Sequence, residues 1–397
     1  MNASNALQLP ERLTEKQFHD IQFNSNQSYF ITVTNTSFQV YKSDPLELRS
    51  KYTFHQPLIP LHAFNVEQDF SLSRQSQKSC FPDPIAGGNG HGNGIAKARM
   101  LSNSNYLTLV TPHECIVWDD YRSRPIFLFD FGDVSVVNAT LTKHYIIIAL
   151  ERQLLIYTML PTPTLVVKYE TFLNESGVMD IRLGDSAIIA FPARSKGQIQ
   201  VVTLTEDGTL STQLLKSHKS SLRTIAISPS GRYLASASEL GTIIRVHDIK
   251  TSSLVNEFRR GADPAVITSM KFSPNDTKLA VVSDKATLHI FKVGDSGETK
   301  GNKHHKLHNL SFLPHYFQST WSFVSKNLSH DNDLVTDTAV VGWSDSETIV
   351  VIWEVKAIWE KWHLQWISKD DTDSKGKWVL LKGGWKTLAK EGGVVGV

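Results

Sequence analysis

Two adjacent arginines, Arg259 and Arg260, are the residues of this chain whose chemistry best suits a phosphate group. A guanidinium stays charged at any cellular pH, and its planar fork donates two parallel hydrogen bonds to a phosphate. The pair follows a strand-like segment, residues 254–258, and Gly261 allows the chain to turn after it. Because successive side chains of a strand point to opposite sides, we expect the two arginines to serve two separate anion sites.

Polar side chains that could complete both anion sites occur before and after the arginine pair. Hydroxyl groups and imidazoles can bond the remaining oxygens, and this mixture suits a phosphorylated inositol headgroup. The first set consists of His218, Ser238, Thr242 and Arg245, and the second of Ser283, Lys285, Thr287 and His289. The second set lies on one face if its segment is extended throughout, whereas the first needs a bulge or a strand-end turn between Thr242 and Arg245.

The elements that must position these sets repeat with a period of 45 residues, the offset between Ser228 and Ser273 (273 − 228). Each Ser-Pro turn is followed by an apolar strand, residues 233–238 or 278–283, and then by another turn and strand. Strand-forming residues broken by turn residues at this spacing are typical of the blades of a WD40-like β-propeller. The two polar sets therefore occupy equivalent positions in two consecutive blades.

A mostly apolar residue pair that ends a strand recurs along the chain and counts the blades. It occurs as Val40-Tyr41, Val117-Trp118, Ile156-Tyr157, Val201-Val202, Val246-His247, Ile290-Phe291 and Ile352-Trp353. These seven pairs predict an all-β fold, a single seven-bladed β-propeller with divergent WD40-like repeats over residues 1–397. The first interval is long because of a polar, Gly-rich insertion at residues 55–97, and an eighth blade hidden there is the alternative.

The string Glu257-Phe258-Arg259-Arg260-Gly261, set between residues 241–245 and 283–291, resembles the motif of the PROPPIN family. The resemblance continues at residues 117–126, 149–153 and 197–201 and spans roughly residues 17–366. It implies a non-enzymatic propeller that binds phosphatidylinositol 3-phosphate and phosphatidylinositol 3,5-bisphosphate. It further implies that Arg259 acts with the first polar set and Arg260 with the second.

The resemblance also implies where the protein acts and what it recruits. We expect a cytoplasmic monomer that is peripheral on the phagophore assembly site, endosomes and vacuole, recruits autophagy machinery and binds no nucleic acid. Family members hold partners around blades two and three, which points to the charged residues Asp119, Asp120, Arg122, Arg124, Glu151 and Arg152. These charges could instead be solvated turn residues, and a generic WD-repeat interaction scaffold without a lipid site is the alternative function.

A long insertion follows Val293, and the resemblance implies that this loop, residues 294–313, faces the membrane. Basic residues suit anionic lipid and apolar residues suit the bilayer interface. The loop offers Lys300, Lys303, Lys306, Leu307, Leu310 and Phe312 for these contacts. The alternatives are a solvated loop, with Leu310 and Phe312 already in the next strand, and a metal site at the histidine-rich residues 304–308. That cluster has no suitably spaced carboxylate or cysteine, so we expect no metal.

Composition argues against several other classes of protein. The net charge of +2 means that an anionic partner must meet a local patch, and no stretch approaches the about 20 apolar residues of a membrane span. Residues 1–12 are too polar for a secretory signal. Cys80 and Cys115 are expected to be reduced thiols, with one chance bridge as the alternative.

Catalytic motifs are absent from the sequence. The Gly-rich residues 87–94 do not match a phosphate loop, so neither an enzyme nor a cofactor is expected. Eight of the nine tryptophans follow residue 320. We expect them mainly in the core of the closing blade, with an aromatic membrane-interface belt as the alternative.

Overall fold

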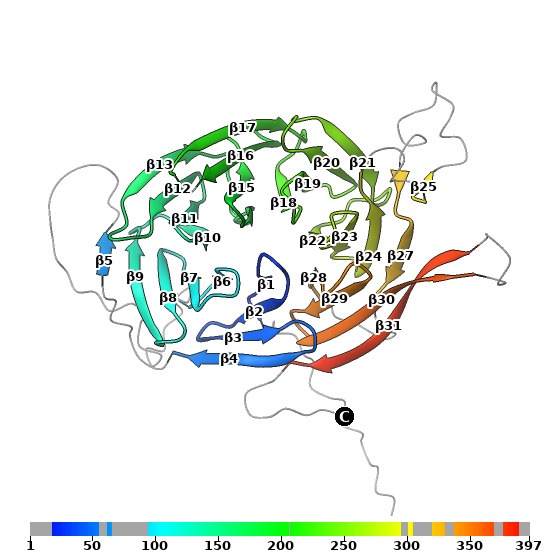
Figure 1. Cartoon of the computed structure of the whole chain (residues 1–397), viewed down its shortest axis with the longest axis horizontal. Helices are drawn as coiled ribbons and strands as arrows, with labels where there is room; N and C mark the ends of the chain where they lie inside the picture. The colour runs from blue at the N-terminus through cyan, green and yellow to red at the C-terminus, as the bar shows by residue number, and fades with distance from the viewer. Residues whose placement is uncertain are drawn as a thin grey trace, which may run out of the picture.

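The computed structural model describes residues 18–54, 62–65, 94–205, 207–294, 301–304, 320–329, 337–368 and 376–388. Its strands form seven separate sheets arranged as a ring around a central axis (Figure 1). In each sheet the four main strands pair antiparallel and lie side by side, with the first strand nearest the axis and the fourth at the outside. The predicted seven-bladed β-propeller is confirmed.

The first four blades use strands in chain order. Blade one contains β1 (Asp20–Phe23), β2 (Tyr29–Val33), β3 (Ser37–Lys42) and β4 (Glu47–Thr53). Blade two contains β6 (Lys97–Met100), β7 (Tyr106–Val110), β8 (Glu114–Asp119) and β9 (Arg124–Asp130), with β5 (His62–Asn65) parallel to β9 at its edge. Blade three contains β10 (Val136–Leu141), β11 (Tyr145–Leu150), β12 (Gln153–Thr158) and β13 (Leu165–Glu170). Blade four contains β14 (Asp180–Arg182), β15 (Ser186–Pro192), β16 (Gln198–Thr205) and β17 (Leu210–Lys216).

Besides β5, the described strands depart from this order in the last three blades, where two strands of a later loop join blade five. Blade five contains β18 (Leu222–Ile227), β19 (Tyr233–Ser238), β20 (Ile243–Asp248) and β21 (Leu254–Arg259). Two short strands of the blade-six loop, β25 (Lys303–His304) and β26 (Thr320–Trp321), extend its sheet. Blade six contains β22 (Ile267–Phe272), β23 (Lys278–Ser283), β24 (Thr287–Lys292) and β27 (Val324–Asn327). Blade seven contains β28 (Ala339–Trp343), β29 (Thr348–Trp353), β30 (Ile358–Ile367) and β31 (Lys377–Thr387).

The residue pairs used to count blades fall one to each blade, but not always on the same strand. Six of them lie on the third strand from the axis, for example Val40-Tyr41 on β3. Ile352-Trp353 lies instead on β29, the second strand of blade seven. The blade count was therefore right, although the seventh pair is not equivalent to the other six.

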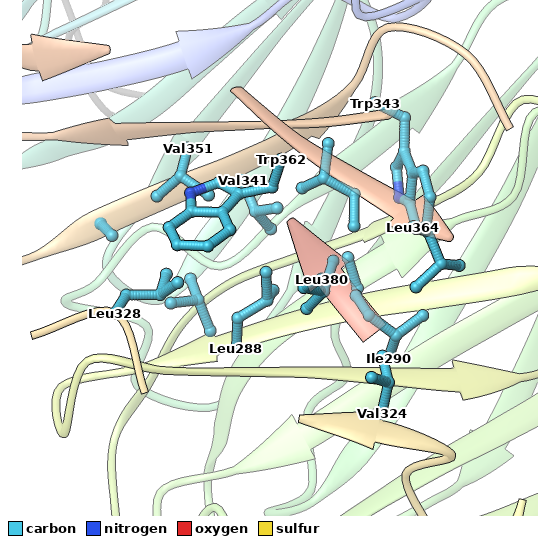
Figure 2. Packing of buried hydrophobic residues seen from close by; sticks show 14 of the residues in the cluster. Leu288, Ile290, Val324, Leu328, Val341, Trp343, Val351, Trp362, Leu364 and Leu380 are labelled. Carbon is cyan, nitrogen blue, oxygen red and sulfur yellow. The ribbon is translucent and has the colours of Figure 1, made fainter. Parts of the chain in front are cut away.

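The core is divided into clusters that each join two neighbouring blades. Alternate strand residues point to the two faces of a blade, so each face packs on a different neighbour. Figure 2 shows the cluster between blades six and seven, where Trp362 and Leu364 lie over Leu288 and Ile290. Trp353, Trp359 and Trp362 are all buried, in agreement with the predicted core role.

The ring closes by packing and polar contacts between blades one and seven. The Trp359 indole donates to the Ser43 carbonyl over 2.9 Å, and Lys361 pairs with Asp44 at 2.9 Å. The Phe18 amide donates to the Glu354 carbonyl over 3.2 Å. Among the described residues, no strand is exchanged between the two blades.

The region predicted as an insertion, residues 55–97, contains two pieces of blade two. β5 lies within it, and β6 begins at its last residue, Lys97. The Gly-rich residues 87–93 and Cys80 lie outside the described residues. Cys115 is free and buried, and burial raises the pKa of its thiol. Within the described part of the chain, no helix is long and apolar enough to cross a membrane.

Candidate functional site

The arginine pair closes the outer strand of blade five. Phe258 on β21 is buried in the cluster shared by blades five and six. The Arg260 amide donates to the Thr242 carbonyl over 2.9 Å, which continues the strand pairing by one residue. By strand alternation Arg260 points to the same side as Phe258, and Arg259 points to the side of blade four. Strand alternation therefore assigns the two arginines to different seams.

At the seam between blades four and five, the structure brings His218 and Arg245 together. Nη1 of Arg245 lies 3.4 Å from Nδ1 of His218 and donates to the Ser217 carbonyl over 2.5 Å. The Arg245 guanidinium also pairs with the Glu257 carboxylate at 2.8 Å. Nε2 of His218 lies 3.1 Å from the Ser236 hydroxyl. Burial, and then the charge of Arg245, lowers the pKa of His218 to about 4, so its imidazole is neutral at pH 7.

The other two members of the first set flank the turn between β19 and β20. Ser238 is buried at the end of β19, two residues from Ser236 and therefore on the same face. Thr242 is half-buried just before β20, whereas Arg245 lies within that strand. The strand-end turn expected between Thr242 and Arg245 is therefore the beginning of β20. We call Arg259 and its four predicted companions the 4/5 site.

At the seam between blades five and six, backbone carbonyls hold Arg260 in place. Its Nε donates to the Gly241 carbonyl over 3.0 Å, and its guanidinium also donates to the Asp263 carbonyl. The side chain is only 6% exposed, which fixes its position far more firmly than that of a surface arginine. Burial lowers the pKa of Arg260, and the carboxylates of Asp284 and Asp263 act in the opposite direction.

His289 is the imidazole of this second seam. Its Nδ1 lies 3.2 Å from the Ser322 hydroxyl, and its ring stacks near Phe291 at 6.3 Å between centroids. Burial lowers the pKa of His289 to about 4, and the charges of Arg260 and Lys303 contribute in the same direction. The imidazole is therefore neutral at pH 7 and lies within the field of two cations.

The hydroxyls of the second set meet through a turn. The sequence placed all four residues of this set on one face only if the segment was extended throughout. That condition is not met, because Ser283 ends β23 and Thr287 begins β24. A tight turn lies between them, in which Ala286 has a φ of +52°. The turn brings the Ser283 and Thr287 hydroxyls within 2.9 Å and leaves Lys285 exposed. Only Thr287 and His289 share a face through strand alternation. We call Arg260 and its four predicted companions the 5/6 site.

Glycine at one turn allows the blades to approach closely at this seam. Gly241 has a φ of +58°, and a Cβ there would lie 1.8 Å from the Ala265 carbonyl oxygen. Its counterpart Gly197, in blade four, has a φ of +72° and would place a Cβ 1.9 Å from the His218 carbonyl oxygen. Such close contact excludes any side chain. Each glycine therefore lets the linker to the next blade enter the seam, and one of these linkers carries His218.

The base of the blade-six loop is attached to the strand that carries the arginines. β26 pairs in parallel with β21, with Trp321 opposite Arg259. The Asn302 side chain exchanges two hydrogen bonds of 2.9 Å with the backbone of Lys292. Asn256 does the same with the backbone of Gly294, at 3.0 and 3.2 Å. The loop therefore leaves and rejoins the propeller beside both sites.

Of the loop residues predicted to meet a membrane, the structure describes one, Lys303, which is exposed on β25. The others, Lys300, Lys306, Leu307, Leu310 and Phe312, lie outside the described residues. The described part of the chain contains no group of His, Cys, Asp or Glu side chains that could hold a metal ion.

Sequence reasoning missed several residues of both sites. Ser217, Ser236 and Glu257 contact the first set, and Ser322 contacts the second. The alternation of β19 and of β21 could have indicated Ser236 and Glu257. No pattern in the sequence indicated Ser322, because the chain reaches it only after the long blade-six loop.

A comparison with models of known protein families shows to which family this chain belongs. The model of the PROPPIN family matches residues 83–355, more than half of the chain. This chain belongs to the PROPPIN family. The match contains both arginines and all eight of their predicted companions.

Relatives of this PROPPIN cover nearly the whole chain. SVP1-like protein 2 of Pichia angusta is 36% identical over 380 residues, which cover 92% of this chain and 93% of the relative. SVP1-like protein 2 of Debaryomyces hansenii is 32% identical over 461 residues, covering 98% and 99%. The structure of Kluyveromyces lactis Hsv2 has a TM-score of 0.69 at 22% identity and covers 94% of this chain and 100% of that chain. KlAtg21, in a complex with the coiled coil of AgAtg16, has a TM-score of 0.61 at 18% identity, covering 93% and 98%.

The charged residues predicted as a partner surface on blades two and three differ in exposure. Arg122, Arg124 and Arg152 are exposed, and Asp120 and Glu151 are half-buried. Asp119 was wrongly predicted to be exposed, since it is only 4% exposed. Its carboxylate accepts from the Arg122 amide over 3.2 Å and stabilises the β8–β9 turn.

Proposed function

We propose that this PROPPIN is a peripheral membrane protein that binds phosphatidylinositol 3-phosphate and phosphatidylinositol 3,5-bisphosphate, one headgroup at the 4/5 site and one at the 5/6 site. The arrangement of the two seams carries the proposal. By strand alternation the end of the outer strand of blade five directs its two arginines to opposite sides, and each side contains an imidazole, His218 beside Arg245 and His289 beside Ser322. No catalytic step is part of this function.

The two seams suit a doubly charged phosphate monoester. Arginine supplies the charge and a fork of donors, while a neutral imidazole and a hydroxyl complete the shell of hydrogen bonds. Both sites are partly shielded from water, which strengthens each electrostatic contact relative to an open surface. Because Arg260 is already fixed by two carbonyls, it has little freedom to lose when a headgroup binds.

The blade-six loop supports binding at a membrane surface. Its base lies beside both sites, and it carries Lys300, Lys303 and Lys306 in sequence. Basic residues near an anionic surface contribute about 1 kcal/mol each. We expect the protein to reach phagophore, endosomal and vacuolar membranes from the cytoplasm as a monomer, with the loop entering the interface.

A protein partner is the other half of the proposed function. The fold neighbour KlAtg21 is found with the coiled coil of AgAtg16, which supports an autophagy protein as the partner here. The exposed arginines of blades two and three, Arg122, Arg124 and Arg152, are the residues we propose for that contact. Blade two lies across the ring from the seams of blade five, and blade four separates blade three from them (Figure 1).

Vesicle flotation tests the lipid sites directly. Wild-type protein should float with phosphatidylcholine vesicles that contain phosphatidylinositol 3-phosphate, and replacing both Arg259 and Arg260 with Thr should reduce flotation below detection. Each single replacement should only weaken binding, because two sites on one surface act by avidity.

Replacing Arg122 and Arg124 with Thr is the matched control, since it removes the same charge from blade two. This control should float like the wild type. Equal flotation with unphosphorylated phosphatidylinositol, or an unaffected Arg259/Arg260 variant, would contradict the lipid sites and favour a scaffold without them.

A further inference from the structure

The hairpin of blade seven extends beyond the body of the propeller. β30 has 10 residues and β31 has 11, and together they project past blade six (Figure 1). Near its base, Leu364 and Leu380 of the hairpin lie beside Ile290 and Val324 of blade six (Figure 2). The apolar face of the hairpin is therefore buried in the core near its base and becomes exposed toward its tip.

Beyond the core, that face continues as a row of aromatic rings. The Trp366 and Trp378 rings meet edge to face at 5.6 Å, and Trp378 meets Phe323 in the same way at 6.0 Å. The Lys292 ammonium lies 5.6 Å above the Phe323 ring. A Cβ at Gly376 would lie 2.4 Å from the Trp366 indole, so glycine is required for this ring to lie across the facing strand. Trp366 is thus held in place although it is 48% exposed.

The row of rings forms one wall of an open pocket of about 800 Å³ between the hairpin and the base of the blade-six loop. The described side chains that line it include three lysines and three aromatic residues, and no carboxylate. They are Lys292, Lys303, Lys377, Phe323, Trp366 and Trp378. Residues 369–375, between β30 and β31 in sequence, include two lysines and three aspartates and lie outside the described residues.

This combination of groups matches the upper part of a phospholipid. Lysine ammonium groups attract a phosphodiester, while tryptophan and phenylalanine rings pack on the glycerol and the first methylenes of the acyl chains. The volume lies within the range usual for small-molecule sites. Lys303 lines the pocket and its charge also acts on His289, so the pocket and the 5/6 site are neighbours on the surface.

We propose that this pocket binds one anionic glycerophospholipid of the same membrane, as a third lipid site between blades six and seven. The proposal rests on the proposed function for its membrane, but it assigns a different lipid and different residues. Its ligand needs no phosphorylated inositol. Any anionic phospholipid, such as phosphatidylserine, carries the required phosphodiester.

The test measures how much phosphatidylserine strengthens vesicle binding. Phosphatidylcholine vesicles are prepared with phosphatidylinositol 3-phosphate, phosphatidylserine, both or neither. The pocket variant combines Trp366→Ala with Lys377→Glu. The matched control combines Trp385→Ala with Lys386→Glu, which changes the same residue types on the same hairpin at an exposed tryptophan outside the pocket. Soluble inositol 1,3-bisphosphate reports the headgroup sites separately, and the thermal midpoint reports folding.

We expect the pocket variant to lose about fivefold or more of the gain from phosphatidylserine, since one lysine near an anionic surface is worth about fivefold. The control should lose less than about twofold beyond the general effect of its charge. The thermal midpoint of both variants should match that of the wild type.

Each result separates this proposal from the proposed function. Equal losses in the two variants, or no gain from phosphatidylserine in the wild type, overturn the pocket even if inositol 1,3-bisphosphate binds. A pocket-dependent gain without any binding of inositol 1,3-bisphosphate supports the pocket and overturns the headgroup sites.

Discussion

The two seams of blade five arise from the same repeat but leave their arginines in different states. At the 4/5 site, Arg245 already has a carboxylate partner in Glu257, at 2.8 Å. At the 5/6 site, Arg260 donates to two carbonyls and is almost completely buried. A phosphate that enters the 4/5 site must compete with Glu257, which is bonded directly to Arg245. At the 5/6 site the side chain of Arg260 donates to carbonyls, and the carboxylates of Asp284 and Asp263 act on it only through their charge.

The difference shows how a repeat can diverge in function without changing its fold. The imidazoles remain alike, since the pKa of both His218 and His289 is lowered to about 4. What differs is the neighbour supplied by the outer strand or by the loop: Glu257 in one seam, and Ser322 with Lys303 in the other. We therefore expect the 5/6 site to be the tighter of the two.

The largest expected effect is the loss of that tighter site. Arg260→Thr should weaken soluble inositol 1,3-bisphosphate at the 5/6 site by about a hundredfold, because two charge-assisted hydrogen bonds are lost. Arg259→Thr should weaken the 4/5 site only about tenfold, since Arg245 and His218 remain there. Isothermal titration calorimetry checks both values and the stoichiometry.

Arg260→Lys serves as the control because it keeps the charge but not the planar fork. It should fall between the wild type and the Thr variant. Equal losses for Arg259→Thr and Arg260→Thr would contradict the ranking of the two sites. Urea unfolding would show whether the Gly241 and Asp263 carbonyls, left without their donor, also lower stability.

Most of the fold could be predicted from sequence because its signals are local. The Ser-Pro turns repeat their contacts as well as their sequence: the Tyr233 amide donates to the Ser228 hydroxyl, and the Lys278 amide to that of Ser273, each over 3.0 Å. Each blade is also built from neighbouring strands in chain order. Among the described strands, the exceptions are β5 beside β9 and the attachment of β26 to blade five, which no local pattern indicates.

The candidate sites were only partly predictable, because their contacts cross between blades. Strand alternation directs Arg259 and Arg260 to opposite sides of the outer strand. It failed for Ser283 and Thr287, where a turn with positive φ at Ala286 replaces an extended segment. The carbonyls that bind Arg260 are backbone groups of turn residues. Every residue has a backbone carbonyl, so the amino-acid sequence does not indicate which ones accept these hydrogen bonds.

The next largest effect is a loss of stability in acid, to which the two seams should contribute equally. The pKa of each imidazole is about 4 in the folded protein, below the value of about 6.5 in the unfolded chain. The unfolded state therefore binds more protons between these values, and stability falls as the pH falls through this window. Between pH 7 and pH 5 each imidazole should cost about 2 kcal/mol of unfolding free energy.

Urea unfolding at pH 7 and pH 5 measures this contribution. His218→Gln and His289→Gln should each recover about 2 kcal/mol of the wild-type loss. His19→Gln, at an exposed histidine before blade one, is the control for the substitution itself. A recovery confined to one variant would show that the two imidazoles do not contribute equally to acid stability, which would contradict the expected similarity of His218 and His289.

The smallest expected effect concerns the competitor at the 4/5 site. Glu257→Gln keeps the shape of the side chain but removes the charge that holds Arg245 and repels a phosphate. Because a partly exposed ion pair contributes at most about 1 kcal/mol, the gain in affinity should be about twofold to fivefold. The titration is made in the Arg260→Thr background, so that inositol 1,3-bisphosphate reports the 4/5 site alone. Glu47→Gln is the control, since Glu47 pairs with Arg49 at 3.0 Å on blade one with similar exposure. A loss of affinity in Glu257→Gln would mean that Glu257 positions Arg245 for the headgroup. Both seams would then offer an arginine that is already oriented to bind a phosphate.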